Sequence, residues 1–198
     1  EQHAHHHHHG EHCTGHHGVD GLDPHFWHDP LQVVRAVEAI RDRLIAIDPA
    51  GAEVYRRGAQ DYQQALQEVD AWAHEQIATI PAERRTLIST HQAFGHFIAA
   101  YGFRDLGSLL DSHSTVAANP SPKRLAELVA SVKEHGVVAL FPERDHQTEL
   151  LQVLARESNL PLAEPLGTGS LGRPGADDDS YLGFFRRNVT IIVEALRP

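Results

Sequence analysis

Residues 86–101 read TLISTHQAFGHFIAAY, a short β-branched run that passes directly into a helical segment. The first five residues predict a buried strand, and a helix is predicted over 93–101. A second apolar run, VVALF at 137–141, follows a helix predicted over 123–135 and ended by Gly136. Buried strands that alternate with helices are typical of βαβ units. The sequence therefore predicts an α/β fold with a parallel sheet.

Further segments extend this pattern in both directions. Toward the C-terminus we expect a helix at 148–158, a short strand at 160–163 and an amphipathic helix at 181–196. Upstream, apolar residues three and four positions apart predict a helix over 31–47, and the Gln-, Glu- and Ala-rich residues 50–80 predict a second one. That second helix would be about 45 Å long, and a helix of this length often bridges two lobes.

The composition favours a cationic partner. The net charge is −10 with histidine neutral, which excludes a nucleic-acid partner because phosphate binding needs clustered Lys and Arg. Histidine is unusually frequent, at 17 residues, and the single Cys13 cannot form an internal disulfide. No apolar run of about 18 residues could span a bilayer. No signal peptide is visible either, so an exported protein would be seen here in mature or trimmed form.

Candidate metal ligands follow the predicted strands and flank the predicted helices. His91 comes directly after the first strand, Glu143 after the second, and residues 177–179 are three aspartates before the last helix. His25 and His28 lie beside the start of the first helix. Parallel sheets bind ligands at the carboxyl ends of their strands, and imidazole with carboxylate suits Zn²⁺. Each residue also has a simpler explanation, such as a helix cap or a surface side chain, and the residues alone leave both open.

Three ordered segments resemble the motifs of the zinc/manganese ABC-transporter solute-binding proteins. They are DPHFWHDP (23–30), STHQAFGHFIAAYG (89–102) and DDDSYLGFFRRN (177–188). The stretch NPSPKRLAELVASVKEHGVVALFPE (119–143) is also similar to that family, so the resemblance covers residues 20–198.

The resemblance implies a specific ligand set. His25, His91 and Asp179 fall on the family's metal-ligand positions, and a histidine at 91 is typical of zinc members where some manganese members have Glu. We therefore expect Zn²⁺ to be favoured over Mn²⁺. The family has an N-terminal lobe that supplies a further histidine and that this chain does not contain, so one ligand is expected from outside the chain.

The resemblance also divides the chain into four parts. These are a flexible His-rich loop (1–22), the remainder of an N-terminal lobe (23–49), a long connecting helix (50–80) and a C-terminal α/β lobe (81–198). The loop holds nine of the 17 histidines, interleaved with Glu, Cys and Gly, which favours a natural loop over a purification tag. We expect it to collect ions at weak, exchangeable sites near the main one.

The function implied is high-affinity binding of a divalent cation, with delivery to a membrane ABC permease. The protein would act as a monomer on the periplasmic or extracellular face of the membrane, and not as an enzyme. One alternative is a metallohydrolase that uses the same two histidines and one aspartate, with Glu143 as the base, although no HExxH motif or nucleophile elbow is present. Another is a metal buffer or adhesin. The sequence leaves the affinity, the permease and any lipid anchor open.

Overall fold

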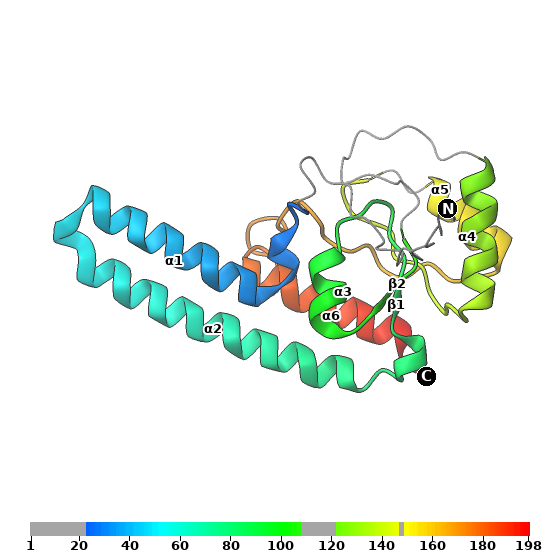
Figure 1. Cartoon of the computed structure of the whole chain (residues 1–198), viewed down its shortest axis with the longest axis horizontal. Coiled ribbons are helices and arrows are strands. Elements are labelled where there is room, and N and C mark those ends of the chain that lie inside the picture. Colours follow the sequence, from blue (N-terminus) through cyan, green and yellow to red (C-terminus); the bar gives the residue numbers. More distant parts are fainter. Residues whose placement is uncertain (1–22, 108–121, 147–148) are drawn as a thin grey trace, which may run out of the picture.

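The computed structural model describes residues 23–107, 122–146 and 149–198, so the predicted His-rich loop lies outside the described residues. Two helices, α1 (Pro30–Ile47) and α2 (Ala52–Ala78), form a long pair that extends from a rounded body holding the remaining elements (Figure 1). Both helices were predicted from apolar spacing, and both are confirmed within two residues at each end.

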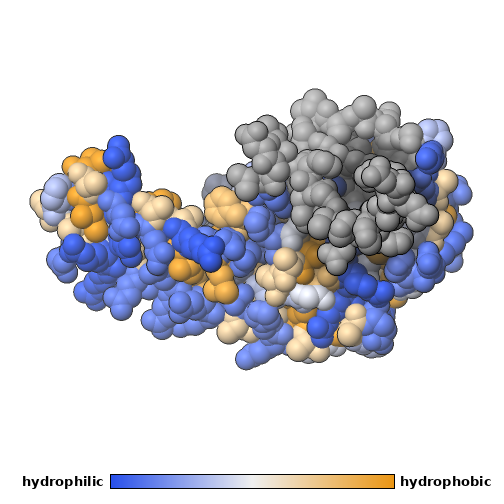
Figure 2. Space-filling view, viewed as in Figure 1, coloured by the Kyte–Doolittle hydropathy of each residue, from blue (hydrophilic) through white to orange (hydrophobic). Residues whose placement is uncertain are grey.

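Helix α1 begins at a proline and is capped by the residue before it. Pro30 occupies the first turn, where its missing N–H costs nothing, and the Asp29 carboxylate accepts a hydrogen bond from the Leu31 amide at 2.9 Å. Beyond Pro30, no residue of α1 is buried. Apolar patches therefore interrupt the hydrophilic surface of the helix pair, as Figure 2 shows, and Ile40 and Ile47 are 59% and 66% exposed.

Helix α2 joins the helix pair to the body. Its buried residues start at Ala59 and continue through Leu66 and Val69 to Ile77, along the part that packs against α6 (Tyr181–Leu196). The first half of α2 lies beside α1 instead (Figure 1). One continuous helix thus has an exposed end and an end embedded in the core. No helix in the described ranges is long and apolar enough to cross a membrane.

A small parallel sheet lies at the centre of the body, which confirms the predicted α/β class. Strand β1 (Thr86–Leu87) pairs in parallel with β2 (Arg104–Asp105). On the other side of β1, the Phe141 amide donates to the Ile88 carbonyl at 3.2 Å. Further parallel bridges join Leu140 to Leu162 and Glu143 to Leu166. The runs 86–90 and 137–141 lie where strands were predicted, although regular pairing covers less of each run than the pattern suggested.

Helices cover both faces of this sheet. They are α3 (Gly95–Tyr101), α4 (Pro122–Glu134), α5 (Glu149–Ser158), α6 and the second half of α2. Neighbouring strand residues point to opposite faces, so Leu87 joins the core beneath α2, α3 and α6 whereas Ile88 joins the core beneath α4 and α5. This double burial explains why both runs are apolar without alternation. The carboxyl ends of the strands then meet at one edge, next to the segment that precedes α1.

Candidate metal centre

The segment before α1 holds His25 in a fixed orientation. The Asp23 carboxylate accepts a hydrogen bond from the His25 backbone amide at 3.0 Å, and the same oxygen lies 2.8 Å from Nδ1 of the ring. The side chain of His25 is buried. A carboxylate on one ring nitrogen sets the tautomer and directs the other nitrogen, Nε2, toward a metal. Asp23 therefore acts as an orienting group for His25.

Trp27 anchors this segment to the body. Its indole Nε1 donates to the Thr168 carbonyl at 2.8 Å, and its own carbonyl accepts from the Tyr181 hydroxyl at 2.9 Å. Burial raises the pKa of Tyr181, so the hydroxyl keeps its proton and stays a donor. Two hydrogen bonds to residues far along the chain thus fix where His25 lies.

His91 lies where the first strand ends, and its ring meets that of His25. Its backbone amide donates to Oε1 of Glu143 at 2.9 Å, and its carbonyl accepts from the Ser89 hydroxyl at 2.8 Å. The ring centroids of His25 and His91 are 5.2 Å apart in an edge-to-face arrangement. Two of the three residues implied as ligands are therefore brought together from separate segments.

Glu143 lies between His91 and a further histidine, His146. Its Oε2 is 2.5 Å from Nδ1 of His91 and 3.4 Å from Nε2 of His146. The ring centroids of His91 and His146 are 4.3 Å apart. One ligand atom from each of the three residues lies within 4.8 Å of the others, which makes them a group able to hold a metal ion. His146 was not considered from the sequence. The spacing Glu-x-x-His directly after a strand was the signal that could have indicated it.

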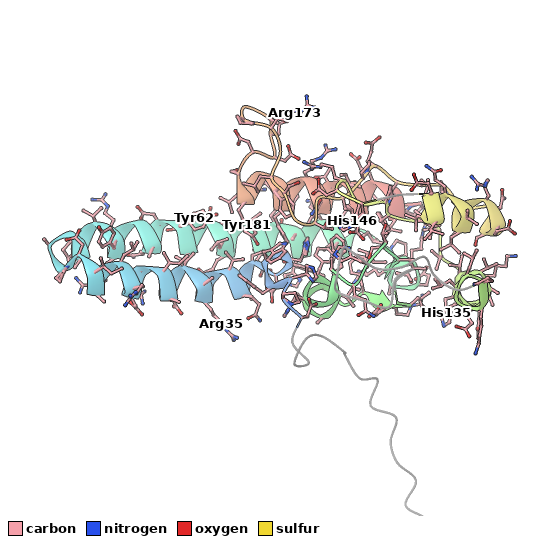
Figure 3. The ribbon with its side chains drawn as sticks, turned by 90° about the horizontal axis from the view of Figure 1, so that it is seen from above. Arg35, Tyr62, His135, His146, Arg173 and Tyr181 are labelled. Carbon is pink, nitrogen blue, oxygen red and sulfur yellow. The ribbon has the colours of Figure 1, made fainter. Side chains whose placement is uncertain are left out.

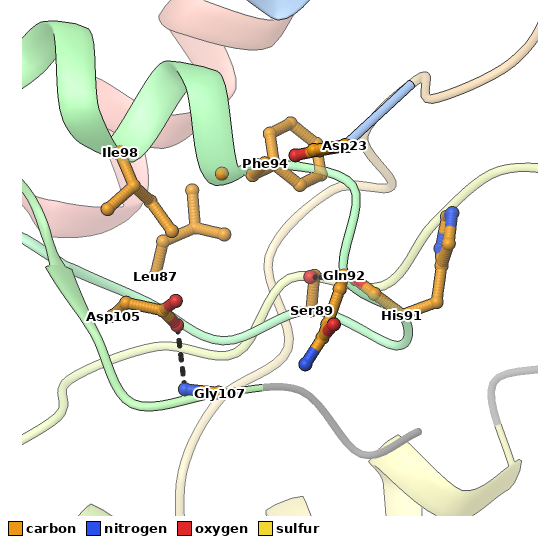
Figure 4. Close-up of a pocket in the computed structure, with 10 residues that line it drawn as sticks. Asp23, Leu87, Ser89, His91, Gln92, Phe94, Ile98, Asp105 and Gly107 are labelled. Atoms are coloured by element: carbon orange, nitrogen blue, oxygen red, sulfur yellow. Dashed lines mark hydrogen bonds between the residues drawn. The ribbon is translucent and has the colours of Figure 1, made fainter. Parts of the chain in front are cut away.

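A small cavity of about 40 Å³ adjoins His91 (Figure 4). Asp23, Ser89 and Gln92 contribute polar groups to its wall, while Leu87 and Ile98 close the opposite side. Its volume exceeds the 10–15 Å³ or so that one water needs, and it is far smaller than a pocket for an organic ligand, which is about 300 Å³ or more. Because His25, Glu143 and His146 do not line it, this cavity adjoins the candidate centre and is not itself the position of the ion.

Asp179, the third residue implied as a ligand, lies outside this cluster. It is exposed, and its Oδ2 accepts from the Gly175 amide at 2.9 Å. In Figure 3, Arg173 marks the loop before α6, which projects from the body, whereas His146 lies in the centre of the molecule. The buried member of the three aspartates is Asp178, whose Oδ2 lies 2.5 Å from Nη2 of Arg144.

His28 has a structural role instead. It is 1% exposed, with its ring 4.4 Å from that of Phe94 and 5.9 Å from that of Phe184. Desolvation, helped by the charge of His25, lowers the pKa of His28 from 6.5 to about 3. His28 is therefore a neutral core side chain at neutral pH.

These features describe a helix-rich α/β protein. Its candidate metal centre consists of imidazoles and carboxylates and lies where the parallel strands end. More particularly, the chain belongs to the ZnuA family, described as zinc-uptake complex component A, periplasmic, whose model matches residues 1–195.

Two curated relatives and one solved structure illustrate the family. The chain is 36% identical to the manganese-binding lipoprotein MntA of Halalkalibacterium halodurans, covering 89% of this chain and 58% of that protein. It is 31% identical to the zinc-binding protein TroA of Treponema pallidum, covering 88% and 58%. The structure of the periplasmic zinc-binding protein TroA superposes with a TM-score of 0.82 at 29% identity, over 89% of this chain and 64% of that one. The chain thus spans less than two thirds of the length of these relatives.

Proposed function

We propose that this chain is part of a solute-binding protein that binds a divalent cation outside the cytoplasm and delivers it to an ABC permease. The observation that carries the proposal is the meeting of His25 and His91, from separate segments, with ring centroids 5.2 Å apart. Each ring also has a carboxylate beside its Nδ1, from Asp23 and Glu143 respectively. Paired imidazoles with adjacent carboxylates are typical of zinc centres.

The ligand set proposed from the family motifs is His25, His91 and Asp179. The Oδ2 of Asp179 accepts from the Gly175 amide, so a role as ligand would fall to its Oδ1 or would replace this hydrogen bond. A further ligand would come from the N-terminal lobe of the complete protein. The exposed apolar residues of α1, including Ile40 and Ile47, support the idea that 23–49 belongs with that lobe.

Zn²⁺ is the proposed preferred ion. Relatives include both a zinc-binding and a manganese-binding protein. Imidazole at position 91 suits Zn²⁺ better than the harder Mn²⁺, which prefers carboxylate and water oxygens. We also propose that the complete protein acts as a monomer at the periplasmic or outer face of the membrane.

A metallohydrolase is less well supported by this site. Both oxygens of Glu143 lie against His91, which leaves this carboxylate badly placed as a general base for a substrate water. A metal buffer or an adhesin would bind the same ion but would not deliver it to a permease. Growth of a zinc-uptake mutant on scarce zinc, with and without the complete gene, separates the two.

The direct test is a zinc titration of the chain by calorimetry, comparing His91→Ala with the control His74→Ala. His74 lies on α2 with its side chain 55% exposed, in contact with Asp70 and Tyr101 and outside the candidate centre. We expect the tightest zinc site to be lost in the first variant and kept in the second. Unchanged stoichiometry and affinity after His91→Ala would overturn the proposal.

A further inference from the structure

Glu143 places a carboxyl group in a part of the molecule that is fully shielded from solvent. Its side chain is 0% exposed, and it follows directly on the sheet, where its bridge to Leu166 holds its backbone. A carboxylate removed from water is costly unless it is paired with a cation or hydrogen-bonded on both oxygens. Here Oε1 has the His91 amide as a donor.

Oε2 has no such donor among the described residues. Although it lies 2.5 Å from Nδ1 of His91, the two atoms are not aligned for a hydrogen bond, and neither has another hydrogen-bond partner in the described ranges. The nearest guanidinium along the chain, that of Arg144, binds Asp178 instead. Within the described structure, the groups around Oε2 are thus imidazoles and not a permanent cation.

His146 brings a second imidazole to the same oxygen. Its side chain is 8% exposed, and its Nε2 lies 3.4 Å from Oε2. The intervening turn is fixed because the Arg144 amide donates to the Leu166 carbonyl at 2.8 Å. The backbone at the edge of the sheet therefore determines the position of His146.

The three ligand atoms have the chemistry of a zinc site, and all of them lie within 4.8 Å of one another. Ligand atoms around a tetrahedral Zn²⁺ with bonds of about 2.0 Å are about 3.3 Å apart. The 2.5 Å and 3.4 Å separations measured from Oε2 each differ from this value by less than about 1 Å. To admit the ion, Nδ1 of His91 and Oε2 of Glu143 would have to move apart by about 0.8 Å, and the ion would supply the positive charge that Oε2 lacks.

We propose that Glu143 and His146 complete, together with His91, a divalent-cation site that lies wholly within this chain. The inference rests on the proposed function because the two share His91, and it adds two ligands that the family motifs do not assign. It also gives the chain a way to hold Zn²⁺ without the carboxylate of Asp179.

The test uses Zn²⁺ and Co²⁺ as probes on the full 198-residue chain, in a background where the nine histidines of 1–22 are replaced by Gln. His146→Ala is compared with His135→Ala, another partly buried histidine, which contacts Ser131 on α4. His146→Gln repeats the test with a bulkier side chain, and circular dichroism in EDTA checks that each variant folds.

We expect His146→Ala and His146→Gln to weaken zinc binding by more than about 100-fold and to change the visible spectrum of bound Co²⁺. His135→Ala should change neither. The spectrum distinguishes a ligand from a residue that merely supports one, whose loss costs about 10–100-fold without changing the ligand set. Asp179→Ala should retain measurable binding.

The two proposals fail in different ways. If the background chain binds neither ion, the site proposed to lie wholly within this chain is overturned. If His91→Ala binds as well as the background, the proposed function itself is overturned. If His91→Ala abolishes binding while both His146 variants keep the affinity and the Co²⁺ spectrum of the background, only the present inference is overturned.

Discussion

The two histidines that meet in the candidate centre are held by carboxylates in very different ways. Asp23 is two residues from His25, and its oxygen contacts both the backbone and the ring of that histidine. Glu143 is 52 residues from His91 and reaches it only across the assembled sheet. The first pair is local and lies near the surface of the body, while the second is fully enclosed. A local pair can be built by a short motif, whereas an enclosed pair depends on the whole fold.

Neutralising each carboxylate in turn tests whether the two pairs contribute differently to metal binding. We expect Glu143→Gln to weaken zinc binding by about 100-fold or more, because a buried charge at the ion is lost, and Asp23→Asn to weaken it by about 10-fold. Both substitutions preserve shape, so each serves as the control for the other. Calorimetric titrations at fixed pH measure the ratio. Equal losses would show that burial does not distinguish the two pairs.

Lowering the pH should destabilise the fold through His28, which lies in the same segment as His25. Folding lowers the pKa of His28 from 6.5 to about 3, so the unfolded chain binds a proton that the folded chain refuses between these values. Stability should therefore fall as the pH drops below 6.5, by about 1.4 kcal/mol per pH unit from this residue, or roughly 2 kcal/mol between pH 6 and 4.5.

Urea unfolding of the metal-free chain across this pH range measures the effect. His28→Phe keeps an aromatic ring between Phe94 and Phe184 and should show a shallower pH dependence than the original chain. A pH slope that stays the same in His28→Phe would contradict the assignment of His28 as a buried neutral side chain.

The ion pair between Arg144 and Asp178 links the Glu143 segment to the loop before α6. Arg144→Met should destabilise the fold by about 1–2 kcal/mol, since Asp178 is 10% exposed and, among the described residues, would keep only the ion pair with Arg187, 3.6 Å away. The double variant with Asp178→Asn should recover part of this loss. Additive losses in thermal unfolding would indicate that the two side chains do not interact.

The smallest effect is expected at Trp27. Trp27→Phe removes the hydrogen bond from Nε1 to the Thr168 carbonyl while keeping an aromatic ring, at a cost of about 1 kcal/mol. Because this bond anchors the His25 segment, zinc binding should weaken several-fold as well. Tyr181→Phe, which removes the other anchor, should behave alike. Loss of stability with unchanged zinc affinity would separate the anchoring from the metal centre.

The spacing of apolar residues predicted the helices well because the residues that determine a helix lie within it. Helix α6 begins and ends where the apolar spacing predicted, and Pro30 marked the start of α1. The parallel sheet was predicted as well, but its pairing is less extensive because only a few backbone groups of each apolar run find partners.

The candidate site was predicted only in part. Motifs pointed to His25 and His91, which the fold brings together, and to Asp179, whose role remains a prediction. Asp23 and His146 were missed. The Glu-x-x-His spacing could have indicated His146, but no linear pattern shows that Glu143 will also lie against His91, since that contact depends on the order of strands in the sheet.

The enclosed pair of His91 and Glu143 can form only in a folded chain. The chain between His91 and Glu143 contains β2 and α4, and His91 meets Glu143 only after these have taken their places. The unfolded chain therefore does not present the proposed ligands together, and the proposed site exists only when the sheet has formed. The metal-free chain would therefore have to reach this arrangement without help from the ion.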